Sequence, residues 1–254
     1  QGVNFRKLNN FAIGQFYAIG VDNRDPYWVY GGMQDNHSWM GPSETRRWIG
    51  IINDDWMQTG FGDGMYQQVD PTSHRYVYAN SNGGSYYRLD AETGDMLDIR
   101  PRAPEGQPSY RWDWASPSLV SRHDPSVVYL GGNRLFISRN RGDSWTRTED
   151  LTRNVDRSEL QLMGVYGSGI AISPNDGTSN FSEISVIAES PLDPGVLWVG
   201  ADDGNLQVSQ IPTEELIMAI TASKIEAMQA KPETFFSEGQ FKLKPHEQTL
   251  FQKF

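Results

Sequence analysis

Cysteine is absent from the 254 residues of this sequence. Disulfides, thiolate metal sites and cysteine nucleophiles are therefore excluded. The compartment stays open, because a chain without cysteine suits the cytoplasm and the periplasm equally. No apolar run approaches 18 residues, so the sequence predicts no membrane-spanning helix. It shows no signal peptide, and it opens on Gln1 instead of methionine, which suggests a processed chain or a piece of a longer one.

Positive charge is scarce as well. Lys and Arg together number 22 against 32 Asp and Glu, which gives a net charge of −10, and no basic cluster stands out. Because phosphate binding needs a local density of Lys and Arg, we predict no nucleic-acid partner. The sequence has no Gly-x-Ser-x-Gly motif, P-loop or dinucleotide fingerprint. No two of its four histidines fall at metal-ligand spacing. We therefore predict no metal and no cofactor.

Short strands joined by tight turns fit what the sequence does contain. It has 25 glycines, 14 prolines and 12% aromatic residues. Four segments share one template, in which a β-rich run leads to an Asp-Pro turn and then to a second apolar run. Proline fixes φ and cannot join a central ladder, so the chain reverses there and the two runs pair antiparallel. The four turns are Asp25-Pro26, Asp70-Pro71, Asp124-Pro125 and Asp193-Pro194.

The spacing of the repeats predicts a β-propeller. Equivalent aromatic residues lie 48, 51 and 69 residues apart, and periods of 40–50 residues with about four strands each are typical of propeller blades; these residues are Tyr30, Tyr78, Tyr129 and Trp198. The longest interval holds an insertion at about 151–182. We expect an all-β fold of about four antiparallel four-stranded blades. Since an open array leaves an exposed sheet edge, we expect these blades to be part of a larger propeller or to close with another chain.

The blade pattern stops after Ser209, which divides the chain into blades at 1–209 and a separate segment at 210–254. Thr213 followed by two glutamates suits a helix N-terminus. The predicted helix runs to about Ala230, with Pro232 beyond its end. The tail that follows carries too many phenylalanines for a solvated segment, so we expect it to lie against a surface of this chain or of a partner.

One motif in the third repeat has the form Ser-x-Asn-x-Gly-x-Ser-Trp. Asn and Gly suit a tight turn, because both tolerate left-handed backbone. The two serines can bond local backbone, and the tryptophan can fold back to cover the turn. The motif therefore predicts a self-contained hairpin between two outer strands, with a structural and not a catalytic role; its residues are Ser138, Asn140, Gly142, Ser144 and Trp145.

This motif resembles the Asp-box of BNR-repeat β-propellers, with Asn140 in place of the usual Asp. From about residue 14 to 209 the chain looks like the sortilin-related, glycosyl hydrolase-like bacterial propellers, which are similar to photosystem II assembly-factor propellers. The resemblance is also carried by 31–39, 62–66, 131–136 and 188–204. It implies a longer, exported parent chain. It does not imply one function, because the family includes peptide receptors, assembly factors and xyloglucanase-like enzymes.

Candidate site residues follow from the expected propeller, whose inner strands line a channel and whose loops at one end form a binding face. Carboxylates beside aromatic rings suit a carbohydrate site, and Asp35 with Asp63 could act as general acid and base. Glu183 occupies a further inner-strand position. Predicted ligand-binding residues are Tyr17, Gln34, Asn36, Tyr66, Trp112, Asp113, Trp114, Asn133 and Arg134.

Each of these interpretations has a structural alternative that the sequence favours more strongly. Asp and Asn flanked by glycine are usually turn formers, which applies to Asp35 and Asp63. The aromatic residues of 112–114 are more often packed between blades than stacked on a ligand. Two acidic stretches, Asp54-Asp55 and 202–205, could bind calcium through oxygen ligands but are more simply hairpin turns.

Two functions follow from these observations. The first is a non-enzymatic propeller module that binds a protein or peptide, or scaffolds an assembly together with the remaining blades of a longer chain. The second is a carbohydrate-active glycoside hydrolase, or a fragment of one, that uses carboxylates at the mouth of the channel. The sequence favours the first and leaves the enzyme question open, because catalytic carboxylates must lie at a defined separation that only a structure can show.

Overall fold

A computed structural model describes residues 4, 14–162, 164–166 and 180–210. All of them belong to the first of two compact units, which spans Gln1–Met218. The predicted helix at 213–230 and the phenylalanine-rich tail lie outside the described residues. Within the described part, no helix has the length and apolar character that crossing a membrane requires.

Four antiparallel sheets make up most of the described chain. The first contains β1 (Phe16–Val21), β2 (Trp28–Met33), β3 (Ser38–Pro42) and β4 (Met57–Gly60), and the second β5 (Gly64–Val69), β6 (Tyr76–Ser81), β7 (Ser85–Asp90) and β8 (Met96–Asp98). The third contains β9 (Ser118–Val120), β10 (Val128–Gly131), β11 (Leu135–Ser138) and β12 (Thr146–Arg147). The fourth has three described strands, β15 (Ile184–Glu189), β16 (Val196–Ala201) and β17 (Leu206–Gln210).

Shorter elements lie outside these sheets. One 3-10 turn, η1 (Asn53–Asp55), belongs to the loop between β3 and β4, and another, η2 (Arg157–Glu159), follows the third sheet. The predicted insertion contains a small hairpin of β13 (Gln161–Leu162) and β14 (Val165–Tyr166).

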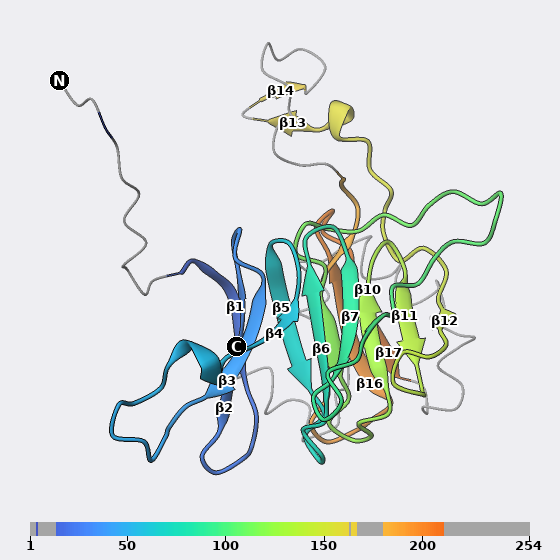
Figure 1. The fold of residues 1–254 in the computed structure, drawn as a ribbon. Helices are drawn as coiled ribbons and strands as arrows, with labels where there is room; N and C mark the ends of the chain where they lie inside the picture. The colour runs from blue at the N-terminus through green and yellow to red at the C-terminus, as the bar shows by residue number, and fades with distance from the viewer. Residues whose placement is uncertain (1–3, 5–13, 163, 167–179, 211–254) are drawn as a thin grey trace, which may run out of the picture. The chain divides into compact units, whose positions relative to one another are not determined.

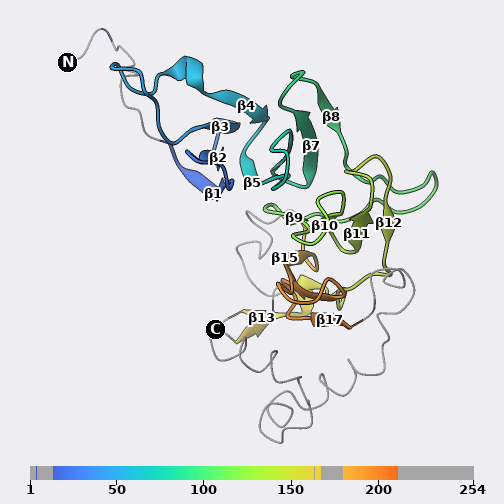
Figure 2. The ribbon, with the colours of Figure 1, turned by 90° about the horizontal axis from the view of Figure 1, so that it is seen from below.

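The sheets follow one another in chain order, as blades of a propeller do. Strand β5 packs on β1 and β2 of the first sheet and on β9 of the third, and β10 of the third sheet packs on β15 of the fourth. Figure 1 shows the strands of the second sheet side by side, and Figure 2 shows each sheet beside the next. The chain therefore has the four-blade β-propeller arrangement that the repeats predict.

The repeated sequence template explains this regularity. Tyr30, Tyr78 and Tyr129 occupy the second strands of their sheets and are buried. In the later repeats the aspartate before proline accepts a hydrogen bond from the backbone N–H two residues on, as Asp70 does from Thr72 at 2.9 Å. Such a bond stabilises the reversal that the Asp-Pro pair predicts. In the first repeat Asp22 has this role, accepting from the N–H groups of Arg24 and Trp28.

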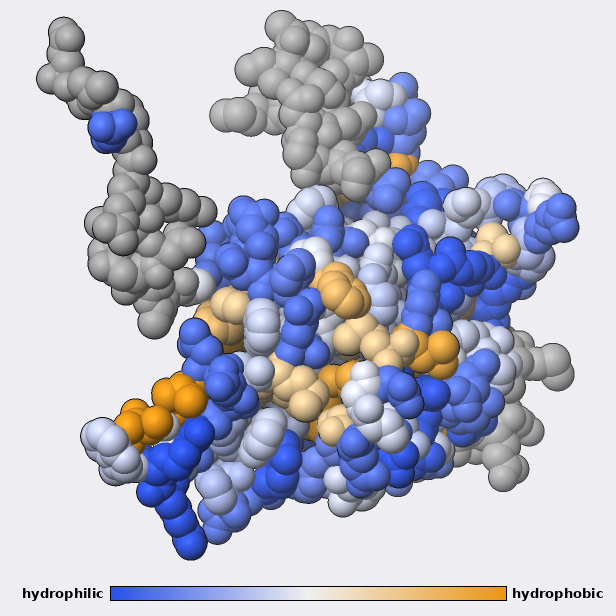
Figure 3. All heavy atoms as spheres, in the orientation of Figure 1, coloured by the Kyte–Doolittle hydropathy of each residue, from blue (hydrophilic) through white to orange (hydrophobic). Residues whose placement is uncertain are grey.

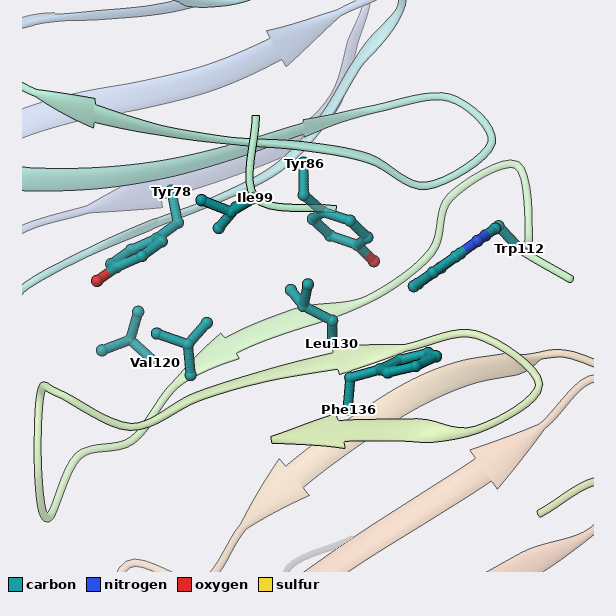
Figure 4. Packing of buried hydrophobic residues seen from close by; sticks show 8 residues of the cluster. Tyr78, Tyr86, Ile99, Trp112, Val120, Leu130 and Phe136 are labelled. Carbon is teal, nitrogen blue, oxygen red and sulfur yellow. The ribbon is translucent and has the colours of Figure 1, made fainter. Parts of the chain in front are cut away.

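The best-developed core lies between the second and third sheets. Tyr78, Tyr86 and Ile99 from the second sheet side meet Leu130 and Phe136 of the third, and Figure 4 shows these side chains pointing toward one another. Trp112 completes the cluster and stacks on Phe136 with 5.1 Å between ring centroids. A smaller core between the first and second sheets contains Tyr30, Met40, Val77 and Leu89.

Candidate functional site

One end of the sheets carries most of the predicted site residues, and we call it the mouth. It is formed by the turn after the second strand of a sheet together with the residue that precedes the inner strand. A backbone hydrogen bond joins these two parts in three repeats. The pairs are Gln34 N to Gln15 O at 2.9 Å, Asn82 N to Asp63 O at 3.0 Å and Asp202 N to Glu183 O at 2.9 Å. The sequence repeat thus brings polar residues far apart in the chain to one edge.

Asp35 and Asp63, the predicted catalytic pair, are neighbours at the mouth. The backbone N–H of Asp35 donates to Oδ1 of Asp63 over 2.8 Å. Asp35 itself has a φ of 59°, in the left-handed region that suits a tight turn. The Asp63 carboxylate therefore fastens the β2–β3 turn of the first sheet to the second sheet. A catalytic role for the pair stays a prediction.

The other predicted residues of the first two sheets lie near the same end. The side-chain amide of Asn36 donates to the carbonyl of Gln34 at 2.9 Å, so this pair contributes to its own turn. Tyr17 is exposed and Tyr66 is half-buried. The first sheet's part of the mouth thus combines a hydrogen-bonded turn with an accessible aromatic ring.

The predicted residues of the third repeat are divided between core and surface. Trp112 is only 3% exposed, so its ring faces pack between sheets and are not open to a ligand. Trp114 is 48% exposed and remains accessible. Asn133 is buried, where its amide donates to Asp150 at 2.7 Å, and Arg134 donates to the carbonyl of Thr148 at 2.8 Å. Asn133 and Arg134 therefore hold their own loop together.

The Ser-x-Asn-x-Gly-x-Ser-Trp motif forms a hydrogen-bonded turn between β11 and β12. Ser138 Oγ accepts from the N–H of Gly142 at 2.8 Å, and Asn140 Oδ1 accepts from the N–H of Ser144 at 2.9 Å. Positive φ falls on Arg141 and Gly142, so Asn140 contributes its side chain and not a left-handed backbone.

Trp145 extends the role of this hairpin beyond its own sheet. Its indole N–H donates to the carbonyl of Ile99 over 2.9 Å, and its ring packs against the core between the second and third sheets. A β-carbon on Gly142 would also meet the Ile99 side chain at 3.0 Å, so the turn itself lies against the second sheet. The hairpin therefore holds two neighbouring sheets together.

A cluster of three carboxylates lies where the third repeat meets the fourth at the mouth. Asp113, Glu183 and Asp202 each offer an oxygen within 4.8 Å of the others. Glu183 is fully buried, Asp113 is half-buried and Asp202 is exposed. The backbone N–H of Glu183 donates to Oδ1 of Asp202 at 2.9 Å, which fixes the β16–β17 turn beside the start of β15.

Electrostatics at this cluster are unfavourable for three ionised groups. Burial, and then the neighbouring Asp202, raise the pKa of Glu183 to about 8, although Arg111 opposes the shift. The residue Asp202 is exposed as a whole, but partial loss of water around its carboxyl group raises its pKa, with Asp113 and Asp203 adding to the effect. Desolvation disfavours a charged carboxylate, and like charges disfavour it further. Glu183 therefore keeps its proton to a higher pH than an exposed carboxyl does.

A second feature lies at the two ends of the array, where one face of each terminal sheet has no neighbouring sheet among the residues that the structure describes. In the first sheet, Tyr30 and Met40 face the second sheet, whereas Ile19 and Val21 point to the other side, where they are 63% and 60% exposed. We call this other side the outer face of the first sheet. Phe16 and Trp56 also cover it, since added β-carbons on Gly31 and Gly41 would strike their rings.

The loop between β3 and β4 adds further apolar surface. Trp48 is 95% exposed, and Ile49 and Ile51 are exposed beside it. Figure 3 shows apolar atoms, in orange, on this loop. At the opposite end of the array, Val186 and Leu206 of the fourth sheet are exposed on the side turned away from the buried Leu197. Exposed apolar surface that clusters in this way marks an interaction site in most proteins.

A pocket of about 270 Å³ opens between the first and second sheets, towards the end opposite the mouth. Asp22, Tyr30 and Gln67 line it together with backbone of β1 and β5. None of the predicted catalytic or ligand-binding residues contributes to this pocket, so it offers no support for the predicted carbohydrate site.

Comparison with solved structures finds two proteins that are similar to this chain. The GH74 xyloglucanase from Xanthomonas campestris is 14% identical, with a TM-score of 0.43 over 71% of this chain and 25% of that chain. YCF48 from Cyanidioschyzon merolae is 11% identical, with a TM-score of 0.39 over 79% of this chain and 54% of that chain. Both are β-propellers. This chain spans about a quarter and about half of their lengths, and such low identities concern the fold alone.

Neither protein-family models nor curated protein sequences match the chain. The structure therefore defines the class of protein, a β-propeller arrangement of four blades.

Sequence reasoning named the acidic residues separately and did not join them. Asp113 was predicted as a ligand-binding residue, Glu183 as an inner-strand position and Asp202 as part of a calcium-binding or turn sequence. They lie 70 and 19 residues apart in the chain, so no local motif connects them. The outer face of the first sheet is easier to recognise in the sequence, because Ile19 and Val21 alternate with small residues along β1.

Proposed function

We propose that this chain is a non-enzymatic propeller module that scaffolds a larger assembly, with the outer face of the first sheet as its docking surface. The partner we propose is a further antiparallel β-sheet that carries apolar side chains at alternate positions. It would come from the remaining blades of a longer chain or from a protein partner, for which a second copy of this chain can substitute because both of its terminal sheets expose apolar strand residues. The observation that carries the proposal is the exposure of Ile19 and Val21 on a face that has no neighbouring sheet among the described residues.

The interior contacts of the array show which chemistry such a partner needs. The first and second sheets pack through Tyr30, Met40, Val77 and Leu89, all apolar and all pointing from strands whose alternate residues face away. The outer face repeats this composition with Phe16, Ile19 and Val21. Burial of apolar surface contributes roughly 25 cal/mol per Å². A sheet stacked on this face would therefore be held by the same force that joins the first two sheets.

The Ser138–Trp145 hairpin supports membership of the Asp-box propellers, which we include in the proposal. Its Ser138 and Asn140 hydrogen bonds give it the structural role expected of an Asp-box. Export from the cytoplasm, which the same resemblance implies, stays a prediction.

The test uses the whole chain and a second copy of it as the probe. We expect light scattering to give a mass that rises above 28.7 kDa with concentration, because apolar end faces associate. The double substitution Ile19→Lys and Val21→Lys should return the mass to that of the monomer. The matched control is Val165→Lys, which also places a lysine at an exposed strand valine but lies on β14.

Two results would overturn this proposal. The first is a chain that stays at 28.7 kDa at every concentration. The second is self-association that survives the double substitution on β1, since the contact would then lie elsewhere. Circular dichroism of each variant confirms that the sheets still form, so that a change in mass reports on the surface.

A glycoside hydrolase is the second candidate function, and one observation favours it. Asp35 and Asp63, from different sheets, meet at the mouth through the 2.8 Å hydrogen bond. Incubation of the chain with a panel of polysaccharides, followed by reducing-end analysis, tests this function. Hydrolysis that is lost in both Asp35→Asn and Asp63→Asn would establish it, while hydrolysis retained in both variants would exclude this pair as catalytic groups.

A further inference from the structure

Glu183 is the least satisfied charged group among the described residues of the mouth. Its side chain is 1% exposed, and neither carboxylate oxygen accepts a hydrogen bond. An unpaired buried carboxylate is costly, because burial removes the water that would otherwise solvate it. Such a group in a folded protein indicates either a retained proton or a ligand that supplies positive charge.

The oxygens of Glu183 face two other carboxylates. Those of Asp113 and Asp202 lie within 4.8 Å of them and of each other. Asp113 is held in place because its Oδ1 accepts from the N–H of Ala115 at 2.8 Å. Asp202 is held by the N–H of Glu183 at 2.9 Å. Three separate segments therefore present acidic oxygens to one small volume.

Arg111 is the cation nearest to Glu183, but it does not neutralise the cluster. Its Nε lies 3.8 Å from Oε1 of Glu183, which is beyond hydrogen-bond distance. Its terminal nitrogen is shared by Asp150 at 3.2 Å, Thr152 at 3.1 Å and the carbonyl of Ser182 at 3.2 Å. One guanidinium thus serves both Glu183 and Asp150, while Asp113 and Asp202 add two further carboxylates, so the site keeps an excess of negative charge.

We propose that Asp113, Glu183 and Asp202 form a calcium-binding site at the mouth. Calcium takes oxygen ligands at 2.3–2.6 Å, so oxygens on opposite sides of one ion are about 4.6–5.2 Å apart. The oxygens of the cluster all lie within 4.8 Å of one another, so a single ion of this size can contact all three. Magnesium demands near-ideal octahedral geometry and gives up its bound water reluctantly, whereas calcium accepts flexible carboxylate geometry, so we assign the site to calcium. The exposed Asp202 gives an ion access from solvent, while Glu183 supplies a buried ligand.

The location indicates what the ion would do. Asp113 precedes the inner strand of the third sheet, Glu183 precedes that of the fourth, and Asp202 lies in the β16–β17 turn. An ion shared by these residues would link the third and fourth sheets. A ligand that binds the folded but not the unfolded chain stabilises it in proportion to the logarithm of its concentration. The site is thus a stabilising cross-link, and it is independent of docking on the first sheet.

The test is thermal unfolding of the full chain after removal of metal with EDTA and dialysis. We expect the midpoint to rise as CaCl₂ is added and to rise much less with MgCl₂ at the same concentration and ionic strength. Isothermal titration with CaCl₂ should give one site. Asp202→Asn should weaken calcium binding by at least ~10-fold, because it removes a negative charge from the ligand set while keeping an oxygen, and even changes outside the direct ligands cost about 10–100-fold. Because Asp202 is exposed, this variant is expected to fold.

Asp203→Asn is the matched control. It removes a negative charge from the same turn, but Asp203 is outside the cluster and accepts from the N–H of Arg153 at 2.6 Å. We expect it to weaken calcium binding less than Asp202→Asn does. The assignment is overturned if the wild-type chain shows no calcium-dependent shift, if magnesium gives an equal shift, or if both variants bind calcium equally well. Glu183→Gln, measured in the same way, should also abolish the response.

Discussion

Asp63 and Glu183 occupy the same place in different repeats, yet their carboxylates meet different surroundings. Each precedes an inner strand, and the carbonyl of each accepts a hydrogen bond from the turn after the second strand of its sheet. The Asp63 carboxylate accepts from the N–H of Asp35, whereas the Glu183 carboxylate accepts no hydrogen bond from the described residues. A repeated backbone position therefore sets where a side chain starts, but its neighbours decide whether its charge is satisfied.

The turn after the second strand of each sheet explains much of the difference between the surroundings of Asp63 and Glu183. Where the fourth repeat has Asp202, the second repeat has Asn82, whose amide carries no charge. Glu183 is also one methylene longer than Asp63, and it is buried where Asp63 is half-buried. Burial and neighbouring like charges make the charged form of Glu183 unfavourable. The Asp63 carboxylate has a different role, since it accepts a hydrogen bond that holds a turn in place.

Of the substitutions considered, removal of Arg111 should lower the free energy of unfolding the most. Arg111→Met leaves Glu183 and Asp150 without their nearest guanidinium, and breaking such a partly buried arrangement costs about 3 kcal/mol. Urea denaturation at pH 9 measures the loss. The matched control is Arg134→Met, which removes an ion pair to the exposed Glu149 and should cost about 1 kcal/mol or less. Equal losses in the two variants would contradict the special role of Arg111.

The pH dependence of stability should distinguish the two carboxylates next. The pKa of Glu183 is raised from 4.5 to about 8, so between these values the folded chain holds a proton that the unfolded chain has lost. The free energy of unfolding should therefore fall as pH rises from 4.5 to 8. Glu183→Gln has no such proton, so it should be more stable than wild type at pH 9 by roughly 2 kcal/mol, as expected for a buried charge without a hydrogen bond.

Measurements for this prediction are made in EDTA, by urea denaturation at several pH values. The charged groups that face Glu183 are Asp113, Asp202, Asp203 and Arg111, and all four remain in the variant. Asp63→Asn serves as the control, since it leaves Glu183 in place and should keep the fall in stability. A wild-type chain whose stability stays constant from pH 5 to pH 8 would show that Glu183 does not retain its proton.

Loss of the hydrogen bond between Asp63 and Asp35 should lower the free energy of unfolding by a smaller amount. Asp63→Ala removes the acceptor of the Asp35 N–H, and the net contribution of one hydrogen bond is about 1 kcal/mol. The loss is measured by thermal unfolding against Asp54→Ala, an exposed aspartate of η1 whose replacement should change stability by less than about 0.5 kcal/mol. If Asp63→Ala were as stable as the wild type, the hydrogen bond would not clasp the two sheets.

Replacement of Asn82 in the second repeat by aspartate, the residue that the fourth repeat has at this position, should have the smallest effect on stability. Asn82→Asp places a carboxylate in the turn beside Asp63, but that turn is accessible to solvent and the Asp63 oxygen already accepts a hydrogen bond. We expect a change in stability below about 0.5 kcal/mol and no new calcium response in thermal unfolding. A calcium-dependent rise at this engineered position would show that the identity of the turn residue alone creates a site.

The architecture could be predicted from sequence because its signals are local and repeated. Asp-Pro turns end strands through the fixed φ of proline, and Tyr30, Tyr78 and Tyr129 mark second strands at blade spacing. The turn at Ser138–Trp145 is equally local, since its bonds join residues at most four positions apart. Two details were beyond reach of the motif: the left-handed residue at Arg141 and the contact of Trp145 with Ile99.

The candidate site was only partly predictable. The order of strands, the turns at the mouth and the alternation that exposes Ile19 and Val21 are properties of short stretches, and the sequence by itself determines them. The meeting of Asp113, Glu183 and Asp202, and the burial that raises the pKa of Glu183, arise only when distant repeats pack against one another. Solvation and charge interactions depend on distances in space, so the tertiary structure alone decided which of these carboxylates accepts no hydrogen bond from the described residues.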